Sequence, residues 1–295
     1  MTERRFVDLH THSTASDGTL SPAEVVALAD AANLAAFALT DHDTTSGLAE
    51  ARTAAALRPA LRFIPGVEVS ARYSPGTMHI LGLGIDENSP ALRRLLAGFI
   101  NARDERNPKI IARLHELGID VGMEDVLAAA ESFEPGRAHV IGRMHIAEAM
   151  RVKGHAQSIQ DAFTRYLSNG GIAFVDKERL DPQEVIQGII AGGGVAVLAH
   201  PVQLKIGDGQ ELEDYVRRLA AWGLGGIEVY HPDHSDGQTR HYLDLARSLG
   251  LLVTGGSDFH GSAKPGVAIG RPKVPLAALT GRLAEMVLGS RRSPA

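Results

Sequence analysis

Phe6-Val-Asp-Leu-His-Thr-His12 is the stretch around which the predicted fold is organised, and Asp17 follows it within five residues. Side chains alternate along a strand, so a strand over this stretch predicts that His10 and His12 project from one face. Two imidazoles on one face near the end of a strand can chelate one divalent metal ion. A His-x-His pair alone is more often incidental than ligating, so the rest of the chain has to supply further ligands.

Strand and helix patterns alternate on both sides of a central helical region. Ser21-Pro22-Ala23-Glu24 combines a serine cap, a proline at the first helical position and a capping-box glutamate, which predicts the start of a helix. Asp181-Pro-Gln-Glu184 repeats this pattern. Strands that alternate with helices predict a parallel α/β architecture. Apolar runs typical of buried strands occur at residues 37–40, 61–69, 79–84, 195–199, 226–230 and 251–254.

Residues 99–171 interrupt this alternation and are predicted to form an α-helical insertion domain. The α/β domain is therefore expected in two parts, residues 1–98 and 172–295. Pro108 and Pro135 are expected to break helices of this central region. Ile172-Ala-Phe-Val175 is expected to be the first strand after the insertion.

Composition excludes several classes of function. The 295 residues include no cysteine, which excludes disulfides, thiolate zinc sites and thiol nucleophiles. The sequence has no signal-peptide core and no run of about 18 apolar residues, so we expect a cytoplasmic protein that does not span a membrane. The net charge of −5 argues against a broad nucleic-acid surface, but it is compatible with a small phosphorylated substrate held by metal ions.

Residues that can bind metal recur at or just after the apolar runs. The carboxyl ends of strands form the reactive face of parallel α/β sheets and barrels, so these residues are predicted to converge on one pocket. Taken singly, Glu68 could be a capping carboxylate and His200 a core histidine, but the repetition favours metal binding. The set is His10, His12, Asp41, His42, Glu68, His79, His200, His231, His234, Asp258 and His260.

The types of ligand in this set indicate the chemistry. Imidazoles and carboxylates without thiolates suit Mn²⁺, Fe²⁺ or Zn²⁺. So many ligands in one pocket would hold two or three ions, and adjacent ions would need a bridging carboxylate. Sites with several metal ions activate water and stabilise both the attacking and the leaving oxygen in phosphoester hydrolysis.

The motifs that carry these residues resemble those of the PHP (polymerase and histidinol phosphatase) family. One branch of that family contains 3′,5′-nucleoside bisphosphate phosphatases and RNase AM-type 5′-to-3′ exoribonucleases. Gly142-Arg-Met-His-Ile-Ala147, Phe163-Thr-Arg-Tyr-Leu167 and Glu228-Val-Tyr-His231 resemble elements of this branch, although Met144 replaces the usual proline. The family motifs are Asp8-Leu-His-Thr-His12, Asp17-Gly-Thr, Thr40-Asp-His-Asp43, Gly66-Val-Glu68, Ala199-His-Pro201 and Gly256-Ser-Asp-Phe-His260.

The resemblance implies a distorted (β/α)7 barrel with a helical insertion and a site for three divalent ions. Mn²⁺ is expected, with Fe²⁺, Zn²⁺ or Mg²⁺ as alternatives. By the family pattern, Glu68 bridges two ions, and the implied reaction is attack on phosphorus by a metal-bridging hydroxide. The implied ligands are His10, His12, Glu68 and Asp258 for one ion, Asp17, His42 and His260 for a second, and Glu68, His79 and His200 for the third.

Further residues are candidates for binding substrate or for proton transfer. Arg143 and His145, with Arg137 as a weaker candidate, could grip a phosphate from the insertion, because arginine binds phosphate bidentately. An arginine on a helix surface is the alternative reading of Arg143. His231 and His234 could protonate the leaving oxygen, since imidazole often serves as a general acid near pH 7.

The predicted function is therefore a metal-dependent phosphoesterase. Its predicted substrates are nucleoside 3′,5′-bisphosphates such as pAp, from which it would remove the 3′-phosphate, and short RNA read from the 5′ end. Histidinol phosphate hydrolysis and C–N hydrolysis of the amidohydrolase type are the alternatives. Amidohydrolases commonly use a carboxylated lysine as the bridge, and Glu68 in that place favours the phosphoesterase. A non-catalytic PHP module is less favoured because the ligand set is complete.

Overall fold

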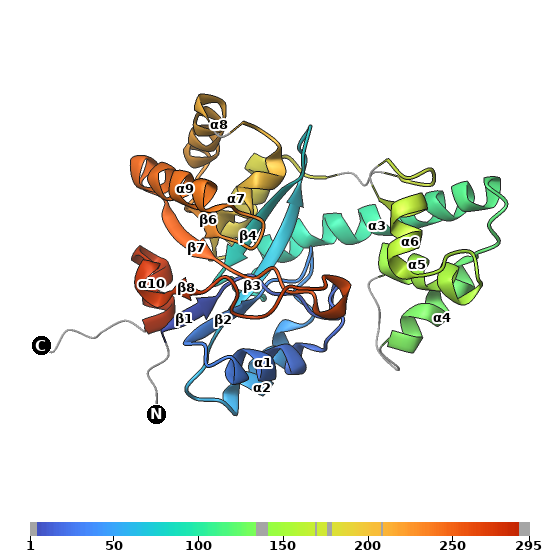
Figure 1. Ribbon diagram of the computed structural model, residues 1–295, viewed down its shortest axis with the longest axis horizontal. Coiled ribbons are helices and arrows are strands. Elements are labelled where there is room, and N and C mark those ends of the chain that lie inside the picture. Colours follow the sequence, from blue (N-terminus) through green and yellow to red (C-terminus); the bar gives the residue numbers. More distant parts are fainter. Residues whose placement is uncertain (1–4, 134–140, 169, 176–178, 208, 289–295) are drawn as a thin grey trace, which may run out of the picture. The chain divides into compact units, whose positions relative to one another are not determined.

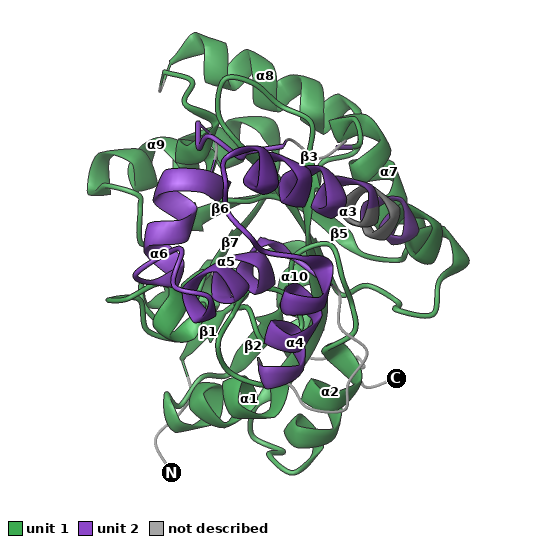
Figure 2. Cartoon of the chain, turned by 90° about the vertical axis from the view of Figure 1, so that its right-hand side faces the viewer, with its two compact units in different colours: residues 1–95, 180–295 green, residues 96–179 purple. Residues whose placement is uncertain are grey.

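The chain forms two compact units in the computed structural model, which describes residues 5–133, 141–168, 170–175, 179–207 and 209–288. Met1–Leu95 and Leu180–Ala295 make the first unit, here called the barrel unit. Leu96–Arg179 make the second, here called the helical unit (Figure 2). The helical unit contains the predicted insertion, residues 99–171, and extends beyond it at both ends.

The barrel unit is built on a single eight-stranded sheet in the order β7-β6-β5-β4-β3-β2-β1-β8 (Figure 1). The strands are β1 (Phe6–Asp8), β2 (Ala36–Leu39), β3 (Arg62–Ala71), β4 (Met78–Leu83), β5 (Val195–Leu198), β6 (Gly226–Tyr230), β7 (Leu252–Gly255) and β8 (Val274–Pro275). The helices of this unit are α1 (Pro22–Ala31), α2 (Leu48–Ala56), α7 (Pro182–Ala191), α8 (Gln210–Ala221), α9 (Asp236–Leu249) and α10 (Gly281–Leu288).

The sheet is nearly closed into a barrel because the segments after β1 and β7 meet. The Leu9 amide donates to the Gly255 carbonyl at 3.1 Å, and Thr11 forms a parallel bridge with Phe259. Gly256 makes this approach feasible, since a Cβ at that position would collide with the side chain of His10. The predicted α/β class and the distorted barrel are confirmed.

Two strands depart from the parallel architecture predicted from the sequence, and one of them is the edge strand β8, which pairs antiparallel with β1. β4 pairs antiparallel with both β3 and β5. Only residues 72–77 separate β3 from β4, which is too short for the crossover that parallel strands need. The pairing of Ser70 with His79 consequently places the amino end of β4 beside the carboxyl end of β3. His79 therefore reaches the reactive edge from the start of its strand.

The first strand is shorter than predicted, because β1 ends at Asp8 rather than at His12. The backbone nevertheless stays in contact with both neighbours beyond Asp8. The His12 amide donates to the Phe259 carbonyl at 2.9 Å, and the Thr40 amide donates to the Thr11 carbonyl at 2.8 Å. His10 and His12 therefore lie on a segment that is held from both sides.

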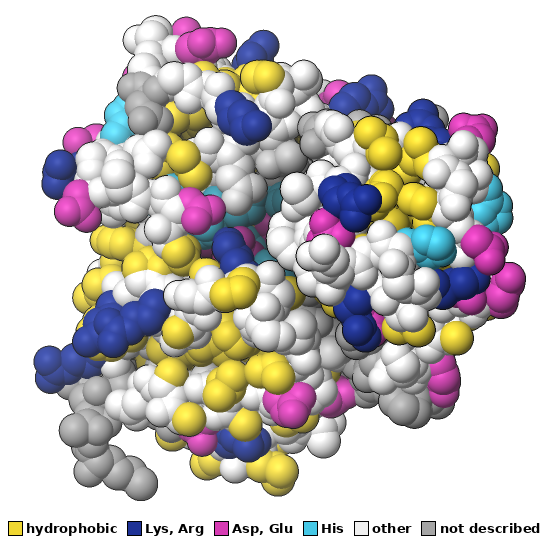
Figure 3. All heavy atoms as spheres, turned by 45° about the vertical axis from the view of Figure 1, so that its right-hand side comes forward, with side chains coloured by type: hydrophobic (Ala, Val, Ile, Leu, Met, Phe, Trp, Pro, Cys, Tyr) yellow, Lys and Arg dark blue, Asp and Glu magenta, His cyan; other side chains and the backbone are white. Residues whose placement is uncertain are grey.

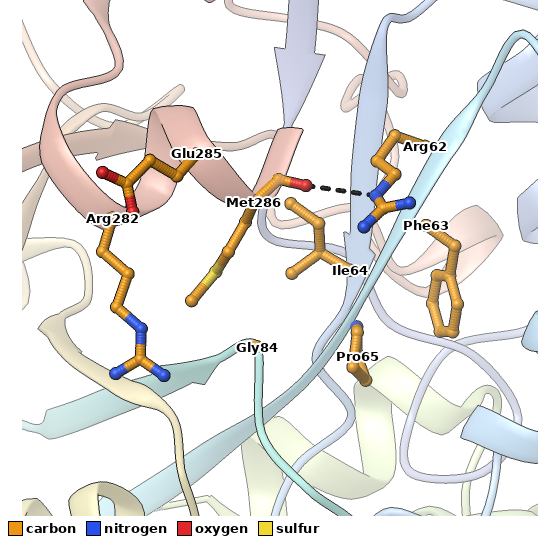
Figure 4. Close-up of a pocket in the computed structure, with 8 residues that line it drawn as sticks. All are labelled: Arg62, Phe63, Ile64, Pro65, Gly84, Arg282, Glu285 and Met286. Atoms are coloured by element: carbon orange, nitrogen blue, oxygen red, sulfur yellow. Dashed lines mark hydrogen bonds between the residues drawn. The ribbon is translucent and has the colours of Figure 1, made fainter. Parts of the chain in front are cut away.

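The opposite end of the barrel is closed by α10. An apolar cluster that includes Val7, Ile64 and Val197 packs with Leu283 of this helix. Arg62 donates to the Met286 carbonyl at 3.1 Å, beside a pocket of about 420 Å³ (Figure 4). The pocket lies at the amino end of β3 and the carboxyl end of β4, away from the Ser70–His79 pair.

The helical unit has its own apolar core. Its elements are the helical-unit part of α3 (Pro90–Glu116), with α4 (Met123–Phe133), α5 (Arg143–Val152), α6 (Ile159–Ala162) and the π-helical turn η1 (Phe163–Leu167). Ile110, Leu114 and Ile146 are fully buried in this core. These residues illustrate how apolar burial can stabilise a short bundle of helices without a sheet.

Two local predictions for this region are wrong. Pro108 lies inside α3 and does not end it, because burial of Ile110 and Leu114 just after it favours continuing the helix. Ile172–Val175 forms no strand. Ala173 is fully buried in the helical core and its amide donates to the Tyr166 carbonyl at 3.0 Å, so the apolar run packs on helices instead of a sheet. Pro135 lies outside the described residues.

Charged side chains are dispersed on the face of the molecule that Figure 3 shows. Lys and Arg side chains lie among Asp and Glu side chains, and no broad basic patch is visible on that face. No helix among the described residues is long and apolar enough to cross a membrane.

Candidate metal centre

Glu68 lies at the centre of a cluster of histidines in the barrel unit. Its side chain is fully buried in β3. Oε1 lies 2.9 Å from His79 Nδ1 and 3.0 Å from His200 Nε2. Oε2 lies 3.2 Å from His10 Nε2, 3.1 Å from His12 Nε2 and 3.1 Å from His42 Nδ1. Each carboxylate oxygen thus faces a different set of imidazoles.

Three groups of side chains have ligand atoms close enough together to hold a metal ion. Within each group the ligand atoms lie within 4.8 Å of one another. Glu68 belongs to two groups, and so do His12 and His42. The groups are His10, His12, Glu68 and Asp258; His12, Asp17, His42 and His260; and His42, Glu68 and His79.

His200 completes this arrangement, although it belongs to none of the three groups. Its Nε2 lies 3.0 Å from Glu68 and 3.3 Å from His79 Nδ1. The structure thus brings all nine predicted ligand residues to one edge of the barrel unit.

The donor atoms of the cluster fit metal ions better than they fit one another. His10 Nε2, His12 Nε2 and Glu68 Oε2 are buried and make no hydrogen bond within the described part of the chain. Buried polar atoms are rarely left in this state, because desolvation without a partner is costly. A divalent cation among them would coordinate these atoms. The donor set of imidazole and carboxylate is also the kind that Mn²⁺, Fe²⁺ and Zn²⁺ accept.

Strong electrostatic coupling within the cluster shifts the pKa values of its members. Burial alone would lower the pKa of His12, but Asp258 and Glu68 raise it to about 10. Burial alone would raise the pKa of Asp258, but His10 and His12 hold that pKa well below its usual range. In the ion-free protein, protons therefore occupy imidazole nitrogens of the cluster. A divalent ion would compete with these protons for the same nitrogens.

Backbone strain is concentrated around the cluster. Asp43, His200 and Asp258 have positive φ angles of 55°, 23° and 52°. Residues other than glycine rarely adopt such angles, and the surrounding structure must hold them. The Ser70 amide holds the Asp43 carboxylate at 2.9 Å, and the His10 carbonyl accepts from the Asp258 amide at 2.9 Å. These contacts hold the backbone from which the ligand side chains project.

Glu228 is a site residue that the sequence reasoning did not single out. It is fully buried in β6, with Oε1 at 3.0 Å from His10 Nδ1 and Oε2 accepting from the His200 amide at 2.7 Å. Burial would raise its pKa, but His10 and neighbouring imidazoles lower it to about 2. The ionised carboxylate therefore holds the His10 proton on Nδ1, which would leave Nε2 as the ring atom that binds a metal ion. Its strand position just before His231 was the available signal.

Asp258 uses its two oxygens for different partners. Oδ1 lies 3.4 Å from His10 Nε2 and 3.3 Å from His12 Nε2. Oδ2 lies 2.7 Å from Lys264 Nζ and 3.4 Å from His231 Nε2. Lys264 is a second site residue that the sequence reasoning missed, because a lysine after a strand motif has no metal-ligand signature.

The two candidate proton donors are not equivalent. His231 is buried, and its Nδ1 accepts from the Asp233 amide at 3.1 Å, which leaves the proton on Nε2 beside Asp258. His234 Nδ1 donates to the Val229 carbonyl at 2.9 Å, so its buried Nε2 carries no proton in the neutral ring. Burial lowers the pKa of His234. Proton donation is therefore better suited to His231 than to His234.

The predicted phosphate-binding residues of the insertion lie in the helical unit and have partners there. Arg143 donates to the Leu167 carbonyl at 2.8 Å, and its guanidinium lies over the rings of Phe163 and Phe174, 5.8 Å from each centroid. His145 Nδ1 accepts from the Gly142 amide at 3.0 Å at the start of α5. Arg137 lies outside the described residues.

Comparison with known proteins identifies the family of the chain. Residues 8–222 match the PHP domain family. The chain belongs to the PHP family. The resemblance of the sequence motifs to this family is thereby confirmed, and the matched residues include seven of the nine predicted ligands, from His10 to His200.

Three curated PHP relatives match most of the chain. A 3′,5′-nucleoside bisphosphate phosphatase from Chromobacterium violaceum is 36% identical over 90% of this chain and 90% of its own length. A phosphoribosyl 1,2-cyclic phosphate 1,2-diphosphodiesterase from Eggerthella lenta is 36% identical over 86% of this chain and 94% of its own. The 5′-3′ exoribonuclease Rnm of Escherichia coli K12 is 34% identical over 90% of this chain and 88% of its own length.

Two solved structures share the fold of this PHP protein. One, from Chromobacterium violaceum, is described as an amidohydrolase with bound SO4 and no metal. It has a TM-score of 0.80 and 35% identity, with 95% of each chain covered. The other, from Bifidobacterium adolescentis, is described as a metal-dependent phosphoesterase. It has a TM-score of 0.79 and 30% identity, with 94% of this chain and 97% of that chain covered.

Proposed function

We propose that this PHP protein is a metal-dependent phosphoesterase that removes the 3′-phosphate of nucleoside 3′,5′-bisphosphates and shortens RNA from its 5′ end. The two activities are one chemistry, because a 3′,5′-bisphosphate is the smallest unit with a 5′ nucleotide and a following phosphate. The observation that carries the proposal is the buried carboxylate of Glu68, whose two oxygens face separate sets of histidines.

Three divalent ions, with Mn²⁺ as the best candidate, account for the ligand groups. His10, His12, Glu68 and Asp258 would hold one ion, Asp17, His42 and His260 a second, and Glu68, His79 and His200 the third. When bound, such ions activate water and neutralise charge on the phosphorus centre. Two of these sets coincide with, or lie within, groups whose ligand atoms are within 4.8 Å of one another.

The named activities of the curated relatives support a phosphorylated ribose as the common substrate element. A nucleoside bisphosphate, an RNA 5′ end and a phosphoribosyl cyclic phosphate all carry phosphate esters on ribose. The sulfate bound by the related Chromobacterium structure has the shape and charge of a phosphate group. A small phosphorylated nucleotide or short RNA fits these observations.

Residues of the chain itself would orient substrate and transfer the proton. His231 carries a proton on Nε2 within the cluster, so it is our candidate for protonating the leaving oxygen. His234 would orient His231, since the centroids of the two imidazole rings lie 5.2 Å apart. Arg143, His145 and Arg137 are proposed to contact a substrate phosphate, and the internal hydrogen bond of Arg143 would have to be shared or exchanged.

The E. lenta relative supports a second candidate, hydrolysis of a cyclic ribose phosphodiester, because it matches this chain as well as the bisphosphatase does. Histidinol phosphate hydrolysis and C–N hydrolysis are further alternatives. Glu68, and not a lysine, is our candidate for the bridging residue, which favours phosphoester chemistry over amide hydrolysis.

A substrate screen with Mn²⁺-loaded protein tests the proposal. The panel contains pAp, AMP, short 5′-phosphorylated RNA, a cyclic ribose phosphodiester, histidinol phosphate and several amides. We expect phosphate release from pAp and mononucleotide release from RNA. Hydrolysis of amides alone, or of none of the phosphate esters, would refute the proposal. Preference for the cyclic diester would select the second candidate.

Metal analysis of Glu68→Ala tests the bridge separately from activity. Removal of a carboxylate that two ions share should release both ions, so the variant should retain at most one ion per chain. Loss of a single ion relative to the wild-type protein would contradict the bridging role.

A further inference from the structure

We propose that Lys264 binds a phosphate oxygen of the substrate, and that Asp258 holds this lysine at the edge of the site until metal ions arrive. The inference rests on the proposed function and adds a phosphate-binding group from the barrel unit itself. Lysine binds phosphate as a point charge on a flexible stem, so its ammonium group can move between neighbouring anionic partners.

The position of Lys264 relative to the ligand cluster carries the inference. Its Nζ lies 2.7 Å from Asp258 Oδ2, whereas Asp258 Oδ1 faces His10 and His12 at 3.4 and 3.3 Å. The ammonium group therefore lies beside a ligand carboxylate without occupying the place of the ion. Its side chain is 31% exposed while that of Asp258 is 8% exposed, so Lys264 is accessible from solvent.

The backbone that carries Lys264 is fixed to the opening segment of the chain. The Ser262 amide donates to Thr19 Oγ1 at 2.9 Å, and the Thr19 amide donates to the His260 carbonyl at 3.2 Å. Lys264 follows directly after the short helix η3 (Gly261–Ala263), whose Gly261 adopts a φ of +66°. The backbone before Lys264 is thus held by hydrogen bonds, and the flexible side chain of Lys264 can reach the substrate.

Charge redistribution explains why Lys264 would change partner. Asp258 would share its negative charge with any divalent ion that it helps to hold, and its attraction for the Lys264 ammonium group would then be weaker. A phosphate group bound at the ions presents further oxygens with net negative charge. The ammonium group would then gain a phosphate oxygen as its partner, and the held position beside Asp258 places it within the same site.

Binding of inorganic phosphate to the Mn²⁺-loaded protein tests this role by calorimetry. Lys264→Met keeps the length of the side chain but removes its charge, and should weaken phosphate binding by about 10- to 100-fold. Lys264→Arg keeps the charge and should retain most of the affinity. Lys153→Met is the matched control, because Lys153 is also 31% exposed and pairs with Asp125 at 2.9 Å, but lies in the helical unit.

Mn²⁺ affinity, measured separately on each variant, distinguishes phosphate binding from a role in positioning Asp258. We expect Lys264→Met to bind Mn²⁺ at least as tightly as the wild-type protein, since a competing cation has been removed. If Lys264→Met binds phosphate as tightly as the wild-type protein, this inference is overturned and the proposed function is not. If Lys264→Met no longer binds Mn²⁺, the same conclusion holds. Absence of phosphate binding by the wild-type protein would overturn both this inference and the proposed function.

Discussion

Buried polar side chains of the metal-ligand cluster in the barrel unit differ in their hydrogen bonding from Arg143 and Glu148 of the helical unit. In the barrel unit, Glu68 and His10 are fully buried with donor or acceptor atoms that make no hydrogen bond in the described structure. In the helical unit, Arg143 donates to a backbone carbonyl and Glu148 binds Arg151 through two hydrogen bonds of 2.7 and 2.6 Å. These two polar side chains find their partners within the helical unit itself.

This difference in hydrogen bonding distinguishes a candidate binding site from a region that has a structural role. Burial of polar atoms that make no hydrogen bond opposes folding, so a ligand that binds these atoms would stabilise the cluster. The helical unit needs no ligand to satisfy the polar groups just described. In the barrel unit, the proposed metal ions would bind the polar atoms of the cluster, and four predictions test this contrast.

The largest effect is expected from Glu68→Gln. Neutralising the carboxylate that faces five histidines should lower kcat/KM for pAp by about 10³-fold or more, beyond the loss that removal of one transition-state contact causes. Glu148→Gln in the helical unit is the control, because it also changes a buried glutamate and should leave turnover unchanged. Equal effects of the two substitutions on kcat/KM would break the contrast between the units.

A smaller effect is expected from Glu228→Gln. Glutamine can accept from only one of the two donors that Glu228 serves, the His10 ring and the His200 amide. Metal affinity should fall by about 10- to 100-fold, as for other residues that orient a ligand histidine. Titration with Mn²⁺ while thermal stability of the ion-free protein is followed separates positioning from folding. Unaltered affinity would show that His10 needs no orientation by Glu228.

The pH dependence of metal binding follows from the pKa of His12, which is raised to about 10. Below this value the ring binds a proton that a metal ion has to displace, so affinity should rise with pH. Each displaced proton corresponds to about a tenfold gain per pH unit between pH 6 and 8, and His10, whose pKa is also raised, would release a second one. Calorimetry in buffers of different ionisation enthalpy measures the proton release. A pH-independent affinity would contradict the shift, and His155→Gln in the helical unit should not alter the slope.

The smallest effect is expected from Arg143→Gln. Loss of the hydrogen bond to Leu167 and of the contacts with two aromatic rings should lower the free energy of unfolding by about 1–2 kcal/mol. If Arg143 also contacts a substrate phosphate, kcat/KM should fall about tenfold. Unfolding curves and kinetics together separate the roles. Reduced stability with unchanged kcat/KM would make Arg143 a purely structural residue of the helical unit.

Much of the candidate site could be predicted from local sequence. His10, His12 and Asp258 stand next to apolar runs, and strand ends converge in any α/β barrel, so their residue types and spacing were sufficient. Strand direction was not predictable in the same way. β4 runs antiparallel because its connection to β3 is short, and that places His79 at the cluster from the opposite end of its strand.

The sequence by itself determined the family, the α/β class, the helical insertion and the residue types of the candidate ligands, because these depend on motifs and periodicities within short segments. Only the tertiary structure decided which groups surround those ligands. Glu228 and Lys264 are far in sequence from His10, and the local sequence of neither residue shows that it contacts the ligand cluster. They become part of the site because β1, β6 and β7 deliver them to one edge of a nearly closed sheet.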